Sequence, residues 1–383
     1  MKKKPKNGIL IAFGELFLKS PDVKKLFIKK LAWNLQHFLK KAEVKAKVHV
    51  LYDRIFVETE DKEAKNILQN IFGVSWFTDA LFFEEADLKS AQGYINTNWE
   101  KKIGKKETYA LRVKIDSSFG SRENVIEKLA EKIDRKVDLS NPDREIFIES
   151  KKGNLFIYFK KEKGAGGFPS ACGENILTLV SGGIDSPVAS YLMAKRGANN
   201  IWLHFHSFPL VSNKSIEKVK ETAKVFVNFQ QSLKIYFVPF QKAQIEIKSK
   251  IPAEYRVLLY RRLMFRIAEK IAEKENCYAL STGESLGQVS SQTLPNMNII
   301  EEVVKIPVLR PLIGMDKEEI IEIAKKIGTF DISIKPQEDC CTLFVPKHSC
   351  AKGDIKKARE MEKMIDVEKI IGEAIEGIKT ENC

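Results

Sequence analysis

The hydrophobic pattern divides the chain into three regions, and the first region covers about 75 residues. Residues 8–13 form an apolar run that predicts a strand, and residues 23–41 repeat hydrophobic side chains at helical spacing with lysines on the opposite face. Two short strands around Val48 and Phe56 and a helix over 62–71 follow. The order βαββα is typical of a ferredoxin-like unit.

The second region, residues 76–168, changes to a different α/β pattern. Strands are predicted over 109–115, 146–149 and 155–160, and an amphipathic helix over 123–136. Taken singly, each basic side chain here is best explained as an ordinary exposed base. Together, four of them are candidates for contacts with RNA phosphates: Arg112, Lys114, Lys151 and Lys152.

The third region follows a stretch rich in Gly, Pro and Ala at 164–173, which predicts a linker. Beyond it, strands and helices alternate to about residue 330. Strands are predicted over 176–180, 200–205, 234–238 and 277–281, and helices over 215–229, 254–274 and 316–327. This alternation predicts a doubly wound parallel sheet with helices on both faces and a ligand at the carboxyl ends of its strands.

The turn after the first strand of this region combines the features of an anion site. Gly182 and Gly183 let the backbone approach a ligand closely, and the N–H groups that begin the next helix attract negative charge. Pro187 suits the first turn of that helix. An ordinary turn would explain the glycine pair alone, but strand, glycines, hydroxyls, acid and helix start coincide here. The stretch lacks the lysine of a Walker A loop, and we predict that it binds phosphate.

Side chains at the ends of other strands are further candidates by the same rule. They are His204 and Phe205 after the second strand, Thr282, Gly283 and Glu284 after a later strand, and Gln292 in the polar loop beyond. Two arginines, Arg261 and Arg262, lie in the middle of a predicted helix, where exposure to solvent is the default expectation.

The composition is that of a globular protein with an excess of positive charge. Hydrophobic residues make up 44% and charged residues 30%, and the formal net charge is +13. No apolar run predicts a membrane span or a signal peptide, so we expect a cytoplasmic protein. Residues 1–165 hold 34 Lys and Arg against 24 Asp and Glu, and the remainder holds 30 against 27. This asymmetry suggests that the first half holds a polyanion, although the surface of a thermophile or a need for solubility explains it equally well.

The six cysteines do not form the regular framework of a secreted scaffold. Cys340, Cys341 and Cys350 lie with His348 in one polar segment, where three explanations compete. A metal site would lack the usual C-x-x-C spacing, and buried structural cysteines are out of place in so polar a segment. We favour a reactive thiol, whose thiolate Lys347 or a protonated His348 would stabilise.

The run Ser-Gly-Gly-Ile-Asp-Ser from Ser181 to Ser186 resembles, position by position, the loop of the PP-loop pyrophosphatases, which split ATP into AMP and pyrophosphate. The resemblance implies adenylation, with ATP and Mg²⁺ as cofactors and no metal ligands assigned in the protein. The ATP-binding residues that it leads us to expect are Leu179, Val180, Ser181, Gly182, Gly183, Asp185, Ser186, His204, Phe205, Arg261, Gly283 and Gln292.

Further phrases extend the resemblance over nearly the whole chain. Residues 109–114, 137–143 and 163–169 resemble the THUMP domain, a tRNA-binding module. Segments similar to the tRNA 4-thiouridine synthetases lie at 14–16, 261–264, 282–292 and 310–317. The implied domains are a ferredoxin-like domain at 1–75, a THUMP domain at 76–168 that could begin near about residue 60, and a PP-loop catalytic domain at 173–383.

The resemblance implies ATP-dependent sulfur transfer to uridine eight of tRNA, through adenylation of O4 and replacement of that oxygen by persulfide sulfur. Asp185 is expected to orient the loop or the metal, and Lys317 to neutralise charge at phosphate. Cys341 is expected to carry the sulfur, with Cys350 as its partner thiol, while Cys340 stays possible. The implied partners are tRNA, a cysteine desulfurase as sulfur donor, and a second copy of the chain in a homodimer.

Some members of the family add a C-terminal rhodanese-like domain. This chain stops at Cys383, so we expect the form that lacks it, which leaves the sulfur route open. Two other functions remain: a different PP-loop adenylating enzyme and a non-catalytic tRNA-binding protein. The sequence decides neither the oligomeric state, nor the reductant, nor whether the cysteines hold an iron–sulfur cluster.

Overall fold

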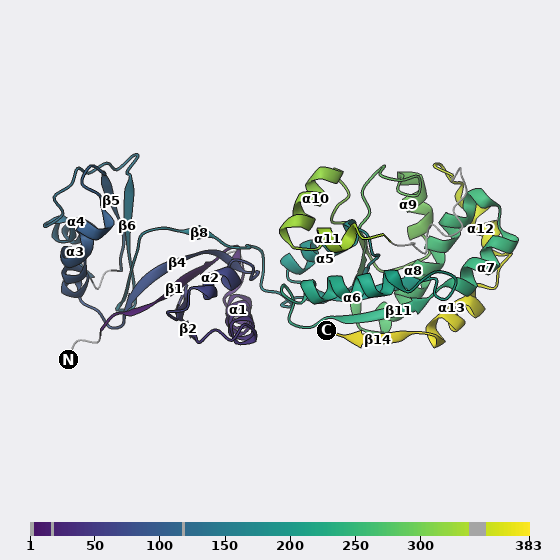
Figure 1. Ribbon diagram of the computed structural model, residues 1–383, viewed down its shortest axis with the longest axis horizontal. Helices are drawn as coiled ribbons and strands as arrows, with labels where there is room; N and C mark the ends of the chain where they lie inside the picture. Colours follow the sequence, from purple (N-terminus) through teal and green to yellow (C-terminus); the bar gives the residue numbers. More distant parts are fainter. Residues whose placement is uncertain (1–3, 17–18, 117–118, 337–349) are drawn as a thin grey trace. The chain divides into compact units, whose positions relative to one another are not determined.

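The computed structural model describes residues 4–16, 19–116, 119–336 and 350–383. The chain forms two compact units, Met1–Pro169 and Ser170–Cys383 (Figure 1). The border between them falls inside the stretch rich in Gly and Pro at 164–173.

The first unit is built on one eight-stranded sheet in the order β2-β3-β1-β4-β7-β6-β5, with β8 paired to β4. Its strands are β1 (Lys6–Phe13), β2 (Lys47–Val50), β3 (Ile55–Glu58), β4 (Val74–Phe83), β5 (Tyr109–Lys114), β6 (Arg144–Lys151), β7 (Asn154–Tyr158) and β8 (Glu162–Lys163). Its helices are α1 (Pro21–Lys41), α2 (Glu63–Leu68), α3 (Leu88–Lys102) and α4 (Arg122–Ala130). The sequence pattern predicted most of these elements but missed β4, α3 and the short β8.

Strand β4 joins the two halves of this unit, because it pairs antiparallel with β1 on one side and with β7 on the other. The border that the sequence suggested near residue 75 falls at the start of this strand. The division of the unit into two domains therefore stays a prediction.

Alternate residues of these strands serve two separate cores, as the pleat requires. Ile9 and Ile11 of β1 belong to the cluster of buried side chains that α1 and α2 complete. Leu10 between them belongs to an aromatic cluster with Phe82 and Phe156, whose rings stack at 5.0 Å.

The second unit contains a six-stranded sheet in the order β13-β12-β9-β10-β11-β14, parallel throughout except for β14. Its strands are β9 (Asn175–Leu179), β10 (Asn199–His206), β11 (Lys234–Pro239), β12 (Cys277–Ser281), β13 (Val308–Leu309) and β14 (Lys379–Asn382). Its helices are α5 (Asp185–Lys195), α6 (Lys214–Phe226), α7 (Gln241–Lys250), α8 (Arg256–Lys274), α9 (Leu294–Glu301), α10 (Lys317–Lys326), α11 (Phe330–Ser333), α12 (Ile355–Glu362) and α13 (Val367–Glu376). The predicted doubly wound parallel sheet is confirmed.

The order of the strands creates a switch point between β9 and β12. From β9 the chain adds β10 and β11 on one side, and it later returns to place β12 and β13 on the other side. The loops after β9 and β12 therefore diverge at the carboxyl edge of the sheet, which is where open α/β sheets bind their ligands.

Helices cover both faces of this sheet. The buried residues Leu203 and Phe205 of β10 pack in one cluster with α7, α8 and α13. Trp202, which points to the other face, packs its ring against Phe226 of α6 at 4.9 Å and donates a hydrogen bond to Ser190 of α5. Among the described residues, no helix is long and apolar enough to cross a bilayer.

Candidate functional site

The loop between β9 and α5 is closed by hydrogen bonds between its two ends. The Ser181 N–H donates to Ser186 Oγ at 2.9 Å, and that hydroxyl donates back to the Ser181 carbonyl at 3.3 Å. The Gly183 N–H donates to Ser181 Oγ at 3.2 Å. The loop thus holds a fixed shape ahead of α5, whose first N–H groups have no partner within the helix.

The loop after β12 packs directly on the start of α5. A Cβ atom on Gly283 would lie 2.6 Å from the backbone nitrogen of Ser186, a distance at which real Cβ atoms essentially never occur. Only glycine therefore lets these two loops approach so closely. The switch point of the sheet and the predicted phosphate loop form one structure.

A cavity of about 550 Å³ opens between these loops. Every predicted ATP-binding residue lines it except Gly182. Five further apolar side chains of the lining were not among the predicted ATP-binding residues: Leu203, Val257, Met264, Phe265 and Val289. A cavity with hydroxyls and glycines at one side and apolar side chains at another suits a nucleotide.

His204 supports the loop from beneath. Its ring is buried, with Nδ1 2.9 Å from the Val180 carbonyl oxygen and Nε2 3.2 Å from Ser215 Oγ. Because a carbonyl oxygen only accepts, Nδ1 carries a proton. His204 therefore fixes the end of β9 relative to α6.

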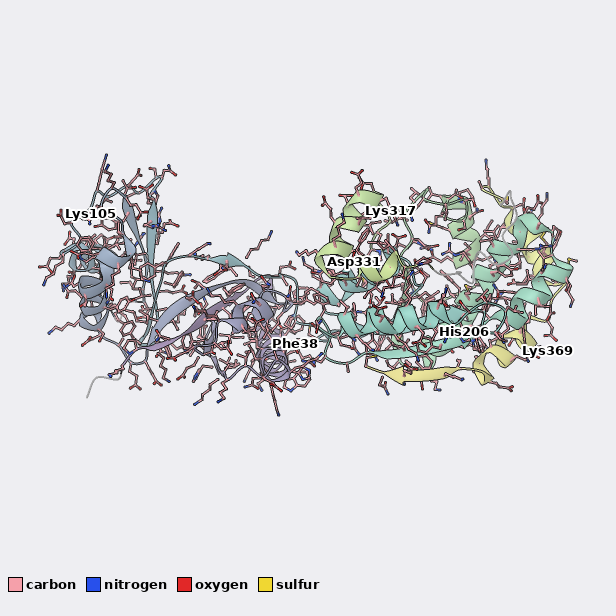
Figure 2. The ribbon with its side chains drawn as sticks, in the orientation of Figure 1. Phe38, Lys105, His206, Lys317, Asp331 and Lys369 are labelled. Atoms are coloured by element: carbon pink, nitrogen blue, oxygen red, sulfur yellow. The ribbon has the colours of Figure 1, made fainter. Side chains whose placement is uncertain are left out.

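Asp185, the first residue of α5, holds a second set of contacts at the cavity. The Lys317 ammonium forms an ion pair with its Oδ1, and Gln288 Nε2 donates to its Oδ2 at 2.9 Å. Lys317 begins α10, which a capping box of Asp316 and Glu319 fixes at its start (Figure 2). The structure thus brings together two of the four predicted catalytic residues.

Glu284 forms the buried charged wall of the cavity. Its side chain is 2% exposed and pairs with Arg261 at 2.5 Å and with Arg310 at 2.8 Å. Burial by itself raises the pKa of this carboxyl group, but Arg261 and Arg310 outweigh burial and hold the pKa below its usual value. The carboxylate is therefore charged at neutral pH.

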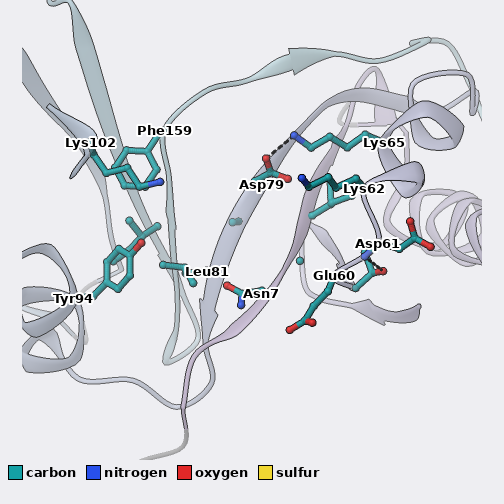
Figure 3. A pocket seen from close by; sticks show the side chains of 15 residues that line it. Asn7, Glu60, Asp61, Lys62, Lys65, Asp79, Leu81, Tyr94, Lys102 and Phe159 are labelled. Atoms are coloured by element: carbon teal, nitrogen blue, oxygen red, sulfur yellow. Dashed lines mark hydrogen bonds and ion pairs between the residues drawn. The ribbon is translucent and has the colours of Figure 1, made fainter. Parts of the chain in front are cut away.

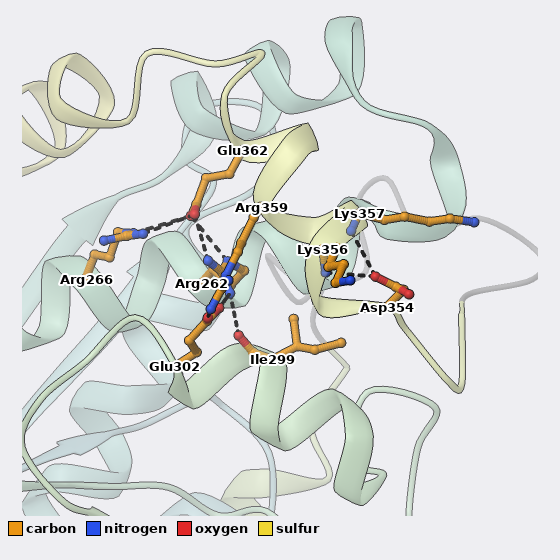
Figure 4. A network of polar contacts seen from close by, with 9 residues as sticks. All are labelled: Arg262, Arg266, Ile299, Glu302, Asp354, Lys356, Lys357, Arg359 and Glu362. Carbon is orange, nitrogen blue, oxygen red and sulfur yellow. Dashed lines mark hydrogen bonds and ion pairs between the residues drawn. The ribbon is translucent and has the colours of Figure 1, made fainter.

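The expectation of a solvated Arg262 was wrong. Arg262 is 2% exposed and lies in a network that joins α8 to α9 and α12 (Figure 4). It donates to Glu362 Oε2 at 2.7 Å and to the Ile299 carbonyl at 2.6 Å. Its helix faces the core there, and the carboxylates of Glu362 and Glu302 make its burial possible.

The predicted sulfur-carrying residues lie mostly outside the described residues. Cys340, Cys341, Lys347 and His348 fall within 337–349, which the structure does not describe.

Cys350 is described and half-buried. Its backbone N–H donates a hydrogen bond to the Glu254 carbonyl at 3.2 Å. Asn296 Nδ2 donates both to the Cys350 carbonyl at 2.8 Å and to the carbonyl of Ser290, a lining residue, at 2.7 Å. Cys350 is thus tied to the wall of the cavity.

The predicted RNA-binding residues lie apart within the first unit. Arg112 is half-buried and already paired within the unit, because its Nε donates to Glu145 at 2.7 Å, and Lys114 is exposed at the end of β5. Lys151 and Lys152 lie at the turn between β6 and β7, with their ammonium nitrogens 5.3 and 4.5 Å from the ring centroid of Tyr52. That ring is 62% exposed, and Lys151 also pairs with Asp53 at 3.4 Å, so the turn presents Lys152 and a partly balanced Lys151 beside an exposed aromatic ring.

The first unit has a hollow between its two halves, and the side chains that line it have mixed charge (Figure 3). Lys62 and Lys102 line it, but so do Glu60, Asp61 and Asp79. Lys65 is already paired with Asp79 at 2.5 Å. This hollow offers no net positive charge to a polyanion.

The chain is similar to proteins of a known family over both of its units. A family model described as Thiamine biosynthesis protein (ThiI) matches residues 171–367, and one described as ThiI ferredoxin-like domain matches residues 8–78. The chain belongs to the ThiI family. The match covers both units and includes the cavity with its loop.

Relatives of this ThiI-family chain carry names that concern tRNA. The "Probable tRNA sulfurtransferase" of Caldanaerobacter subterraneus subsp. tengcongensis is 39% identical over 96% of this chain and 97% of its own. That of Moorella thermoacetica is 38% identical over 97% of this chain and 96% of its own. A solved 4-thiouridine synthetase, in complex with RNA and with bound ATP, superposes with a TM-score of 0.87 at 32% identity, covering 98% of this chain and 99% of that one.

Proposed function

We propose that this ThiI-family chain is a tRNA sulfurtransferase, which uses ATP to adenylate O4 of uridine eight and then replaces that oxygen with sulfur. One observation carries the proposal: the predicted phosphate loop and the other predicted ATP-binding residues, Gly182 excepted, line a single cavity at the switch point of the sheet. The names of the relatives and the ATP and RNA bound to the solved 4-thiouridine synthetase support the same function.

The lining of the cavity favours one orientation for ATP in the proposed complex. The triphosphate meets the Ser181–Ser186 loop and the start of α5, where N–H groups and the helix dipole favour negative charge. The base meets the apolar lining from Leu203, Met264 and Phe265. Gln292 Oε1 is buried with no hydrogen-bond partner among the described residues, so it can accept from an amino group such as that of adenine.

Asp185 has the chemistry to hold Mg²⁺. Magnesium takes oxygen ligands and is typically bound by one or two carboxylates together with substrate phosphates. Asp185 supplies such a carboxylate at the start of α5, in contact with Lys317. When bound, the metal would offset charge on the pyrophosphate, and Lys317 would balance charge that develops at the phosphate.

The chemistry proceeds in three displacements. Uridine O4 attacks the α-phosphorus of ATP, which expels pyrophosphate and makes AMP a leaving group at C4. The terminal sulfur of a persulfide on Cys341 or Cys350 then attacks C4 and expels AMP. A second thiolate attacks the cysteine sulfur of this adduct, which releases the thiolated base, leaves a disulfide and so requires an external reductant.

The first unit would hold the tRNA, with residues 76–168 acting as a THUMP domain. The Lys151–Lys152 turn beside Tyr52 supports this part, because lysines bind phosphates and an exposed ring can stack on a base. The proposal also includes a cysteine desulfurase as the sulfur donor and a homodimer. It places the protein in the cytoplasm, where such a donor and tRNA meet.

Mass spectrometry of tRNA tests the function directly. The protein is incubated with tRNA, ATP, Mg²⁺ and a persulfide donor, and the nucleosides are analysed afterwards. We expect replacement of oxygen by sulfur in a uridine at position eight, dependent on ATP. Unmodified uridine under these conditions, with the protein folded and binding tRNA, would reject the proposal.

A further inference from the structure

Glu284 connects the nucleotide cavity to two arginines, and nothing in the reaction scheme above uses it. It follows β12 directly after Gly283, lines the cavity and is 2% exposed. A buried carboxylate is costly unless its partners stabilise the charge. Its burial at this place therefore depends on the groups that it contacts.

Each oxygen of Glu284 has its own partners. Oε1 lies 2.5 Å from Arg261 Nη2, whereas Oε2 accepts from Arg310 Nε at 2.8 Å and from Thr282 Oγ1 at 3.0 Å. The carboxylate therefore cannot turn without breaking one of these contacts. Arg261 is fixed a second time, because its Nη1 donates to Ser291 Oγ at 3.2 Å.

The two arginines differ in their remaining contacts. Arg310 has a second carboxylate, Glu301, at 2.6 Å. Arg261 lines the cavity and is 17% exposed, and Glu284 is its one ion-pair partner among the described residues. Glu284 thus determines the direction of the guanidinium that faces the cavity.

We propose that Glu284 is a positioning residue for ATP, which holds the Arg261 guanidinium in the orientation that binds the nucleotide. The inference rests on the proposed function and adds a residue to it. Glu284 itself touches no reacting atom in this scheme, and its effect passes through Arg261.

Glutamine at this position would break the arrangement with almost no change of volume. Both arginines only donate hydrogen bonds, so the amide group of a glutamine would place a donor against one of them. Arg310 keeps Glu301 in either case. Arg261 would lose its charged partner and keep only the Ser291 hydroxyl, so its guanidinium would be held less firmly.

The Arg262 network supplies a matched control. Arg262 neighbours Arg261 on α8, and like Glu284 it is 2% exposed. It donates to Glu362 through two nitrogens, Nε at 3.3 Å and Nη2 at 2.7 Å (Figure 4). Neither Arg262 nor Glu362 lines the nucleotide cavity. Glu362→Gln therefore weakens a buried ion pair between α12 and α8, the helix that also carries Arg261, without touching the nucleotide cavity.

The experiment measures equilibrium ATP binding by the full chain, with thermal unfolding recorded for each variant. We expect Glu284→Gln to weaken ATP binding by about 10- to 100-fold. This is the usual effect of losing one hydrogen bond from a charged group, here the bond from Arg261 to the nucleotide. Glu362→Gln should lower the unfolding temperature but change ATP binding by less than about twofold. Arg261→Lys should weaken binding in the wild type and add little in the Glu284→Gln variant, because coupled residues are not additive.

Three results would overturn the inference: normal ATP binding by folded Glu284→Gln, equal weakening by Glu362→Gln, or additive effects of the Glu284 and Arg261 substitutions. If Glu284→Gln does not fold, Glu284→Asp takes its place, since it keeps the charge but withdraws the carboxylate from Arg261. Weakened binding by that variant supports the inference, and unchanged binding overturns it. Failure of the wild type to bind ATP would instead reject the proposed function.

Discussion

The carboxylate of Asp185 and the ammonium of Lys317 form an ion pair across 132 positions of the sequence. Gln288 occupies the other carboxylate oxygen, so both oxygens of Asp185 are engaged. A metal-bound triphosphate that reaches this loop must share the carboxylate with Lys317. The pair therefore places the positive charge of Lys317 beside the loop at which the proposed reaction releases pyrophosphate.

Replacing Lys317 should impair the chemical step more than binding. Lys317→Met removes a charge that would stabilise the developing negative charge, and loss of one such group typically costs about 10²- to 10³-fold in rate. We expect this loss in tRNA-dependent release of pyrophosphate, with ATP affinity reduced by less than about tenfold. Lys326→Met, at the exposed end of the same helix, is the control. Unchanged pyrophosphate release by Lys317→Met would contradict the assigned role.

Gly283→Ala should separate the two loops of the cavity. The added Cβ would meet the Ser186 backbone nitrogen at 2.6 Å, and such overpacking typically costs about 1–3 kcal/mol. We expect denaturant unfolding to show this loss and ATP binding to weaken as well. Gly314→Ala is matched, because a Cβ there has no atom within 4 Å. Equal behaviour of the two variants would show that the close approach is unimportant.

Cys341→Ala should abolish thiolation while adenylation continues. The cysteine enters the proposed reaction only after AMP has become a leaving group, so tRNA-dependent pyrophosphate release should persist. Cys277→Ala is the control, because burial, aided by Glu275, raises the pKa of Cys277 to about 12 and keeps that thiol unreactive at neutral pH. Full thiolation by Cys341→Ala would point to Cys340 or to another kind of adenylating enzyme.

Reversing the charges of Lys151 and Lys152 should weaken tRNA binding. Log affinity for tRNA falls as log salt concentration rises. If both lysines neutralise phosphates, the double substitution to Glu makes this fall less steep, by about 2 in the magnitude of the slope. The same change at Lys105 and Lys106, exposed elsewhere in the first unit, alters net charge equally (Figure 2 labels Lys105). Identical losses in both variants would show a general charge effect and no local site.

Acid should destabilise the second unit through His206. Burial, assisted by His204 and Lys379, lowers the pKa of His206 to about 4, against 6.5 as its ordinary value. Between about pH 6.5 and 4, His206 binds a proton in the unfolded chain but stays neutral in the folded chain. The free energy of unfolding therefore falls as the pH drops from 6.5 to 4. The full difference corresponds to roughly 3 kcal/mol. His206→Gln should flatten the fall in denaturant unfolding curves, and an unchanged slope would contradict it.

Local pattern was enough to predict the turn between β9 and α5, since strand, glycines and helix start are contiguous. The same holds for α10, which begins at the Asp316 cap and ends before Gly328 with its positive φ of 76°. The Glu284 contacts could not be predicted, because Arg261 and Arg310 come from elements whose packing the sequence pattern does not specify. Arg262 was misjudged for the same reason, as its burial depends on Glu362, 100 residues away.

Strand β14 is the clearest example of an element that local sequence pattern does not predict. Its residues Lys379–Asn382 are all polar, so no hydrophobic pattern marks them as a strand. They become one by pairing with β11, and Cys383 and Leu233 exchange two backbone hydrogen bonds beyond them.

This polar strand also shields its neighbour. Without β14, the backbone groups of β11, a strand whose residues Ile235 to Val238 are buried, would form an open edge ready to pair with another chain. Deleting residues 379–383 should therefore produce aggregates during purification. A fusion tag is better attached through a flexible spacer that leaves this pairing intact.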